Sequence, residues 1–176
     1  MITYSMSLSL DGYVAGPDGS FAWGAPSEEL HRFHNERVAA VDAQLLGRRL
    51  YETMLVWDTE EFADPVMAEF AEIWRPLEKI AFSTTLASVE GSNRLATGSL
   101  EEEIDALGER RIAVGGAGLA AECMRRGLVD EFELFVVPIV IGGGTPFFPP
   151  DVEIDLELVE TRTFGGTVYL HYRRRG

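Results

Sequence analysis

The first part of the chain alternates apolar and polar side chains, which is the pattern of a β-strand with two different faces. The apolar face consists of Ile2, Tyr4, Met6, Leu8 and Leu10. Asp11-Gly12 follows as a turn signal and predicts the end of this strand. Further short apolar runs predict strands at 43–46, 79–82, 95–97, 111–114 and 132–141.

Apolar residues at helical spacing separate these strands. Ser27 is a predicted N-cap, because acids follow it in the first turn and Leu30, Phe33, Val38 and Val41 share one helical face. Other helices are predicted over 48–56, 65–74 and 118–126, with a short one after Ser99. Alternating strands and helices predict parallel β-α-β units, to which a final hairpin (156–164 and 167–172) adds an antiparallel edge. The predicted fold is therefore α/β, with a mostly parallel central sheet and a C-terminal antiparallel hairpin.

The bulk composition fits one soluble domain over 1–176, since 46% of the residues are hydrophobic and 25% are charged. The net charge of −14 would repel nucleic acid and anionic membranes, so neither is an expected partner. Cys123 is the only cysteine, which excludes an intrachain disulfide. The amino-terminal residues lack a signal-peptide pattern, and no apolar run approaches the roughly 20 residues of a membrane-spanning helix. We therefore expect a cytoplasmic protein.

A glycine cluster, Gly115-Gly116-Ala117-Gly118, lies between a predicted strand and a predicted helix. Bare backbone amides at a helix N-terminus suit a phosphate group, but such a turn can equally be structural. The pattern Gly116-x-Gly118-x-x-Ala121 formally matches a dinucleotide fingerprint. A standard Rossmann domain is not expected, because two-thirds of the chain precedes the motif and the acids that follow come too early.

Two further strand ends carry groups that could bind an anion. Arg48 and Arg49 follow Gly47 at the start of a predicted helix, where cations oppose the helix dipole unless an anion is bound. The alternative is a solvated basic patch. Ser83 and Thr84 follow the strand at 79–82, where hydroxyls bind phosphate or ribose but also cap turns. Because the carboxyl ends of parallel strands meet at one sheet edge, the three stretches together predict one elongated site for an anionic ligand.

The order of these motifs resembles that of dihydrofolate-reductase-like proteins. The likeness is greatest to the reductase domain of the bifunctional riboflavin-biosynthesis deaminase–reductase and its stand-alone relatives, and it extends from about residue 2 to 173. The stretches that carry it are SLDGYVA (9–15), GRRLYE (47–52), FSTTL (82–86), VGGAG (114–118) and VPIVIGGG (137–144).

This resemblance implies a reductase that uses NADPH. By position, Arg48 and Arg49 would bind its phosphates, the 83–84 hydroxyls would lie near its adenosine end, and the 115–119 turn would wrap its pyrophosphate. Ala15 would approach the nicotinamide. Leu50 departs from the pattern, since dihydrofolate reductases usually carry a phosphate-binding threonine there. The implied cofactor-binding residues are Ala15, Gly47, Arg48, Arg49, Ser83, Thr84, Gly115, Gly116, Ala117, Gly118 and Leu119.

The segment after Trp23 resembles the part of dihydrofolate reductase that carries a pterin-anchoring carboxylate. The Trp–Pro spacing selects Glu28, whereas the Leu–Phe spacing selects Glu29. An acid in an apolar pocket has a raised pKa and can relay a proton, but acids in a first helical turn also simply offset the dipole. Asp58 is the alternative acid by likeness to the riboflavin enzyme. Candidate walls of the substrate pocket, each of which could also be ordinary core, are Leu8, Trp23, Leu46, Tyr51 and Trp57.

These features together predict an NADPH-dependent reductase that transfers hydride to a pterin- or pyrimidine-like heteroaromatic substrate. One member of that class is 5-amino-6-(5-phosphoribosylamino)uracil of riboflavin biosynthesis. The alternative is a nucleotide-binding protein of the same fold without efficient catalysis. No metal is expected, because His31 and His34 have no third ligand nearby. The apolar strand at 132–141 and the terminal hairpin are candidate surfaces for a homodimer.

Overall fold

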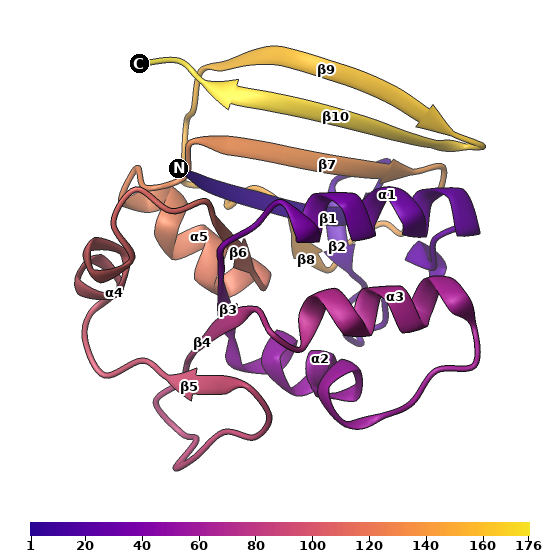
Figure 1. Ribbon diagram of the computed structural model, residues 1–176. Helices are drawn as coiled ribbons and strands as arrows, with labels where there is room; N and C mark the ends of the chain where they lie inside the picture. Colours follow the sequence, from indigo (N-terminus) through magenta and orange to yellow (C-terminus); the bar gives the residue numbers. More distant parts are fainter.

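One large sheet runs through the protein, and the computed structural model describes all of residues 1–176 (Figure 1). Its strands are β1 (Ile2–Ser9), β3 (Ala43–Gly47), β4 (Glu78–Phe82), β5 (Asn93–Leu95), β6 (Ile112–Gly115), β7 (Glu131–Val137), β9 (Leu156–Phe164) and β10 (Thr167–Arg174). They lie in the order β5-β4-β3-β6-β1-β7-β10-β9. Pairing from β5 to β7 is parallel, whereas β10 is antiparallel to β7 and to β9. The predicted α/β fold with a C-terminal antiparallel hairpin is confirmed.

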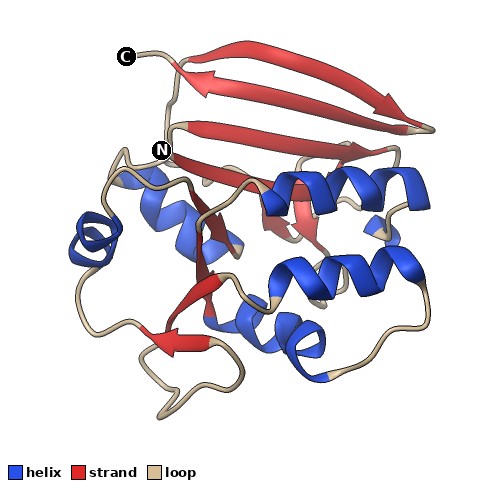
Figure 2. Cartoon of the chain, viewed as in Figure 1, coloured by secondary structure: helices blue, strands red, loops and turns tan.

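Helices cover both faces of this sheet (Figure 2). They are α1 (Glu28–Ala39), α2 (Arg48–Thr59), α3 (Pro65–Trp74), α4 (Leu100–Leu107) and α5 (Ala117–Arg125), with a short 3-10 helix η1 (Ala22–Gly24). Helices α4 and α5 pack on the more apolar face and complete the largest hydrophobic cluster. Helices α1, α2 and α3 lie on the other face, where two smaller clusters form against α1 and between α2 and α3.

The alternation along β1 separates these two layers. Ile2, Tyr4 and Leu8 are buried in the largest cluster, as the apolar pattern predicts. The polar residues between them point to the opposite face, beneath α1. Leu10 falls after the end of β1 and is 65% exposed, so it does not continue the apolar face.

The helices differ in whether a side chain accepts hydrogen bonds from the free backbone N–H groups of their first turn. Ser27 accepts a hydrogen bond from the Leu30 amide, Asp64 caps α3, and Ser99 forms a capping box with Glu102. In contrast, α2 and α5 begin after glycines, and neither has a side-chain cap. Their first backbone N–H groups therefore remain available for another partner.

The chain departs from the prediction after β7. This strand ends at Val137 rather than at 141, because Pro138 has no N–H to continue the ladder. The chain then passes through three glycines with positive φ, at 142–144. Two short strands that the pattern did not indicate, β2 (Tyr13–Ala15) and β8 (Thr145–Pro146), pair antiparallel beside the main sheet.

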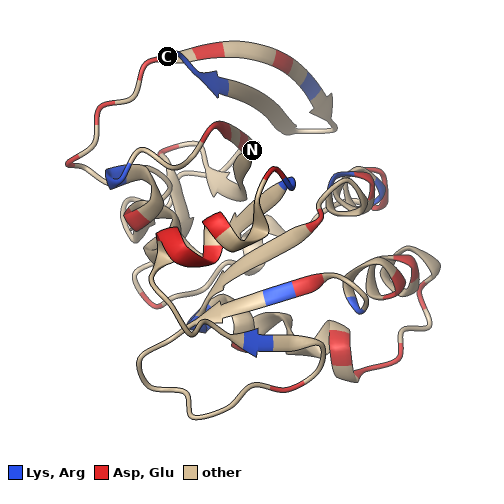
Figure 3. Ribbon diagram, turned by 60° about the vertical axis from the view of Figure 1, so that its left-hand side comes forward, with Lys and Arg blue, Asp and Glu red and all other residues tan.

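Acidic residues are spread over the whole fold. Acidic residues recur on the helices and connecting loops, including the first turn of α4, where the helix dipole favours them (Figure 3). No helix has both the length and the apolar character needed to cross a membrane.

Candidate functional site

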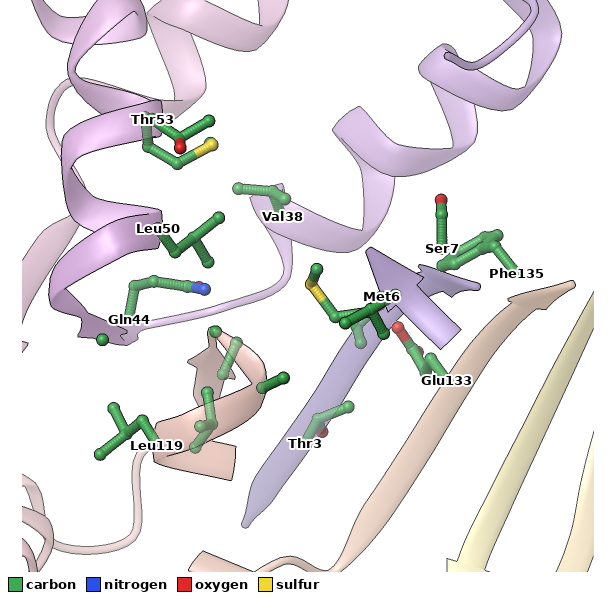
Figure 4. A pocket seen from close by; sticks show the side chains of 18 of the residues that line it. Thr3, Met6, Ser7, Val38, Gln44, Leu50, Thr53, Leu119, Glu133 and Phe135 are labelled. Atoms are coloured by element: carbon green, nitrogen blue, oxygen red, sulfur yellow. The ribbon is translucent and has the colours of Figure 1, made fainter. Parts of the chain in front are cut away.

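A cavity of about 1040 Å³ lies between the sheet and the helices α1 and α2 (Figure 4). Its outer end is formed by the carboxyl ends of β3 and β6 and by the first turns of α2 and α5. Its inner end extends over the polar face of β1 and reaches the buried acids of β7. The cavity therefore joins the predicted strand-end motifs to a region that the motifs did not indicate.

Two uncapped helix N-termini meet at the outer end. Strands β3 and β6 are parallel neighbours with Leu46 opposite Gly115, so Gly47 and Gly116 lie side by side. A methyl group on Gly116 would lie 3.6 Å from the Gly47 Cα atom. Both helices therefore point their positive dipole ends and free amides at one place, which is the arrangement that binds a phosphate or another anion.

Arg48 and Arg49 are the first two residues of α2 and add positive charge at this place. Arg48 lies 3.5 Å from Glu52, an exposed pair one helical turn apart. The Arg49 guanidinium has no carboxylate partner, although the protein carries a net charge of −14. The sequence-based inference that an anion neutralises these arginines is consistent with this geometry.

The side chain of Leu50 explains why the turn has a glycine at position 115. Its side chain lies over Gly115, so that a Cβ at this glycine would overlap with the Leu50 Cδ2 atom. The leucine thus fills the space against the turn. One turn further along α2, the Thr53 hydroxyl lines the cavity and donates to the Arg49 carbonyl oxygen at 2.9 Å.

Ala15 reaches the cavity through the small β2–β8 pair, where it lies opposite Thr145. The backbones approach closely there, since a Cβ on Gly144 would overlap with the Ala15 carbonyl oxygen. Gly144 has φ of +134°, a conformation that disfavours other residues. The glycine run that follows β7 therefore holds Ala15 at the cavity wall.

Comparison with known proteins shows the family and the fold of this chain. Residues 1–170 match the model of the RibD C-terminal domain. The chain belongs to the RibD C-terminal domain family. Among its relatives, protein YwjB of Bacillus subtilis is 31% identical over 96% of this chain and 95% of its own length. Protein YyaP of the same organism is 29% identical over 99% of this chain and 95% of its own.

Solved structures share the fold at lower identity. The diaminohydroxyphosphoribosylaminopyrimidine deaminase/5-amino-6-(5-phosphoribosylamino)uracil reductase of Thermotoga maritima has a TM-score of 0.69 and 16% identity. The structural match covers 99% of this chain but only 56% of that enzyme. Dihydrofolate reductase from Enterococcus faecalis, solved with NADP(H), has a TM-score of 0.67 and 15% identity over 100% and 97% of the two chains. These likenesses confirm the dihydrofolate-reductase-like fold.

Ser83 and Thr84 lie at the same sheet edge as the glycines, but they do not line the cavity. Gly47 pairs with Phe82, the residue before Ser83, so these hydroxyls lie next to the part of the site that Gly47 forms. The Ser83 hydroxyl accepts hydrogen bonds from the amides of Thr85 at 3.1 Å and Leu86 at 3.0 Å. In this RibD C-terminal domain Ser83 thus has the turn-capping role that composition alone allowed.

Of the candidate substrate walls, only Trp23 lines the cavity, from η1. Leu8 and Leu46 are buried core residues. Tyr51 is also buried, and its hydroxyl accepts a hydrogen bond from the Glu90 amide at 2.8 Å. Trp57 stacks on Phe62, with ring centroids 4.5 Å apart, and also lies outside the cavity. These four side chains are held by packing between the sheet and the α2–α3 pair or in the opposite layer, not at the site.

The candidate acids on α1 also lie outside the cavity. Glu28 and Glu29 are exposed in the first turn, and Glu28 pairs with Arg32 at 2.8 Å on the surface. The reason is the rotation of the helix. Leu30 and Phe33 pack on the sheet side against the cluster at Phe135, which turns both glutamates toward solvent.

Asp58 is buried but structural. Its carboxylate lies 3.4 Å from the ammonium group of Lys79 and accepts a hydrogen bond from Asn93 at 3.1 Å. Lys79 is fully buried, and burial lowers the pKa of its ammonium group. The pair holds the segment before β5 against β4, away from the cavity.

Sequence reasoning missed the inner end of the cavity. His34 and Arg37 line it from α1, and Glu131 and Glu133 line it from β7. The two glutamates are 5% and 2% exposed. The signal was present in the sequence EFELFVV, since two acids at alternate positions of an apolar strand share one face.

His34 has no hydrogen-bond partner and lies against Phe135, with ring centroids 4.3 Å apart. Burial lowers its pKa to about 4, so the ring is neutral at pH 7. No group of three or more histidine, cysteine or acidic side chains could hold a metal ion.

We expect this histidine to make stability depend on pH. Its folded-state pKa lies below that of the unfolded chain, so stability is present above about pH 6.5 and is lost toward pH 4. The free energy of unfolding should fall by about 1 kcal/mol between pH 7 and pH 5.5. Urea denaturation at the two pH values measures this, and His34→Leu should remove most of the decline. An equal decline in the variant would assign the effect to other groups, such as His31, whose pKa burial also lowers.

Proposed function

We propose that this protein is an NADPH-dependent reductase that transfers hydride to a pterin- or pyrimidine-like heteroaromatic substrate. Membership of the RibD C-terminal domain family supports an oxidoreductase in general. The cofactor is inferred from one observation. Two uncapped helix N-termini meet at the mouth of a large cavity, where Arg48 and Arg49 also lie. This arrangement fits the negatively charged phosphates of a dinucleotide.

Each part of the outer site has a role in this proposal. The amides after Gly47 and Gly116 would hold the pyrophosphate, together with Arg48 and Arg49. The turn at Ser83 and Thr84 would lie toward the adenosine end. Residues 117–119 line the same wall of the cavity. Ala15 would border the nicotinamide, which supplies the hydride when the cofactor is bound.

The substrate would occupy the cavity beside Ala15 and Trp23, beneath α1. The substrate of the Thermotoga maritima enzyme, 5-amino-6-(5-phosphoribosylamino)uracil, is one member of the proposed class. Neither Glu28 nor Glu29 contacts this space, so we propose no proton relay through them.

Titration of the protein with NADPH, followed by cofactor fluorescence, tests the cofactor. We expect saturable binding at micromolar NADPH, a typical range for an enzyme ligand. Oxidation of NADPH with a panel of pterins and ribosylaminopyrimidines then separates an enzyme from a protein that only binds nucleotides. Absence of binding at about 1 mM NADPH would reject the proposal.

Arg49→Ala is expected to weaken NADPH binding about fivefold, because a cation beside a phosphate contributes about 1 kcal/mol at a partly exposed site. The effect should shrink at high salt. Arg32→Ala is the matched control, since Arg32 is an exposed arginine that pairs only with Glu28 on α1. A variant with unchanged affinity at low salt would place the phosphates elsewhere.

We also propose a homodimer. Strand β9 is one of the two free edges of the sheet, and its residues Leu158 and Val159 are 52% and 44% exposed. Exposed apolar side chains on an unpaired edge favour association with a second strand. Light scattering should give twice the chain mass of 19.5 kDa. A mass of one chain would contradict the dimer.

A further inference from the structure

The inner end of the cavity presents a row of unpaired hydroxyl groups. Thr3, Ser5 and Ser7 share the face of β1 that lies beneath α1, and all three line the cavity. None of these hydroxyls has a hydrogen-bond partner within the protein, and the amide of Gln44, on the same sheet face, has none either. Figure 4 shows Thr3, Ser7 and Gln44 around this space. Polar groups without protein partners on a cavity wall are available to a ligand.

Glu133 supplies a carboxylate to the same wall. Its Oε1 atom accepts hydrogen bonds from the Arg37 guanidinium and, at 3.0 Å, from the Tyr169 hydroxyl. Its Oε2 atom has no partner in the protein, although the residue is only 2% exposed and lines the cavity. One carboxylate oxygen is thus used to hold the group in place, and the other is free to accept a hydrogen bond from a ligand.

The arginines at this end are already matched by acids. Arg37 faces Glu133, Arg111 lies 3.4 Å from Asp42, and Arg173 lies 3.2 Å from Glu131. The amino group of Met1 donates to the Arg110 carbonyl oxygen at 3.2 Å. No side chain here is a free cation like Arg49 at the outer end. A phosphate beside Glu133 would have to draw Arg37 out of its ion pair, and it would then lie next to the buried carboxylate, whose charge repels it.

We infer that the inner end of the cavity selects a substrate whose tail is hydroxylated or amino-bearing and not phosphorylated, with Glu133 Oε2 and the β1 hydroxyls as its hydrogen-bonding partners. This inference rests on the proposed reductase function. It assigns Glu133 as a specificity-determining residue, and it separates this chain from the Thermotoga maritima enzyme, whose named substrate carries a phosphoribosyl group.

The test compares two ligands that differ only in the phosphate, 5-amino-6-ribosylaminouracil and its 5′-phosphate. Calorimetric titration of the NADP⁺-saturated protein should give a Kd at least about tenfold lower for the unphosphorylated compound. The kcat/KM for NADPH oxidation should show the same preference. Equal affinity, tighter binding of the phosphate, or binding of neither compound would overturn the inference.

Glu133→Gln tests the residue itself. The amide has no charge to pair with Arg37, so this guanidinium becomes available to the phosphate. The ratio of the two Kd values should therefore fall at least about threefold. Glu157→Gln, an exposed position on β9, should leave the preference unchanged. An unchanged ratio in a folded Glu133→Gln protein would contradict the assignment. Normal NADPH binding without the preference would reject this inference alone, whereas loss of NADPH binding in the native protein would reject the proposed function.

Discussion

Replacement of Lys79 by methionine is expected to destabilise the protein by about 3–5 kcal/mol, because it leaves a buried carboxylate without its partner. Lys79 is the only lysine in the chain and is 0% exposed. Its ammonium group donates to the carbonyl oxygens of Trp74 at 2.7 Å and Leu77 at 3.2 Å, and it lies 3.4 Å from Asp58. Methionine has a similar length but can satisfy none of these acceptors.

The free energy of unfolding in urea measures this effect. Lys79→Met combined with Asp58→Leu should recover part of the loss, because no charge then remains buried without a partner. The matched surface control is Arg32→Met, for which we expect a loss of about 0.5 kcal/mol or less. If Lys79→Met cost under about 1 kcal/mol, the pair would have to be accessible to water, contrary to its burial.

Replacement of Gly116 by alanine is expected to weaken NADPH binding by about two orders of magnitude. The new methyl group would project between the N-termini of α2 and α5, 3.5 Å from the Leu50 Cβ atom and 3.6 Å from the Gly47 backbone. A phosphate displaced from this place would lose one or two hydrogen bonds to a charged group, each of about 1.5–3 kcal/mol. Gly116 also has φ of +92°, which adds a strain of about 1–2 kcal/mol in the folded protein.

A second glycine separates these two effects. Gly108 ends α4 with φ of +63° and has no atom within 4 Å of its Cβ position, far from the site. Gly108→Ala should therefore lower stability by a similar amount but leave NADPH affinity unchanged. Fluorescence titration and urea denaturation of both variants measure the two quantities. Wild-type affinity in a folded Gly116→Ala protein would show that the phosphate binds elsewhere.

Local patterns predicted most of the elements because their causes are local. Ser27, Asp64-Pro65 and Ser99 mark helix starts through hydrogen bonds to amides two or three residues away. The alternation in β1 and the Gly165-Gly166 turn of the last hairpin are likewise patterns of neighbouring residues. The end of β7 at Val137 was missed, since the apolar run continues to residue 141 although Pro138 breaks the ladder.

The outer site was predictable for a related reason. In a parallel sheet, the residues after each strand lie at one edge, so Gly47, Arg48 and the 115–118 turn had to come together once the topology was assigned. The resemblance to dihydrofolate-reductase-like proteins then supplied their expected ligand. Ser83 and Thr84 reach the same edge but stop beyond the cavity, because Ser83 is used to cap its own turn.

The sequence by itself determined most of the strands, the helices, their order and the motifs at the strand ends, because these depend on periodicity and on short-range hydrogen bonds. Only the tertiary structure decided which acid meets the cavity. The packing of Leu30 and Phe33 turns Glu28 and Glu29 outward, and the same rotation brings His34 and Arg37 to Glu133 on a distant strand. Such a contact depends on helix rotation and strand register across about 100 residues, which no local pattern contains.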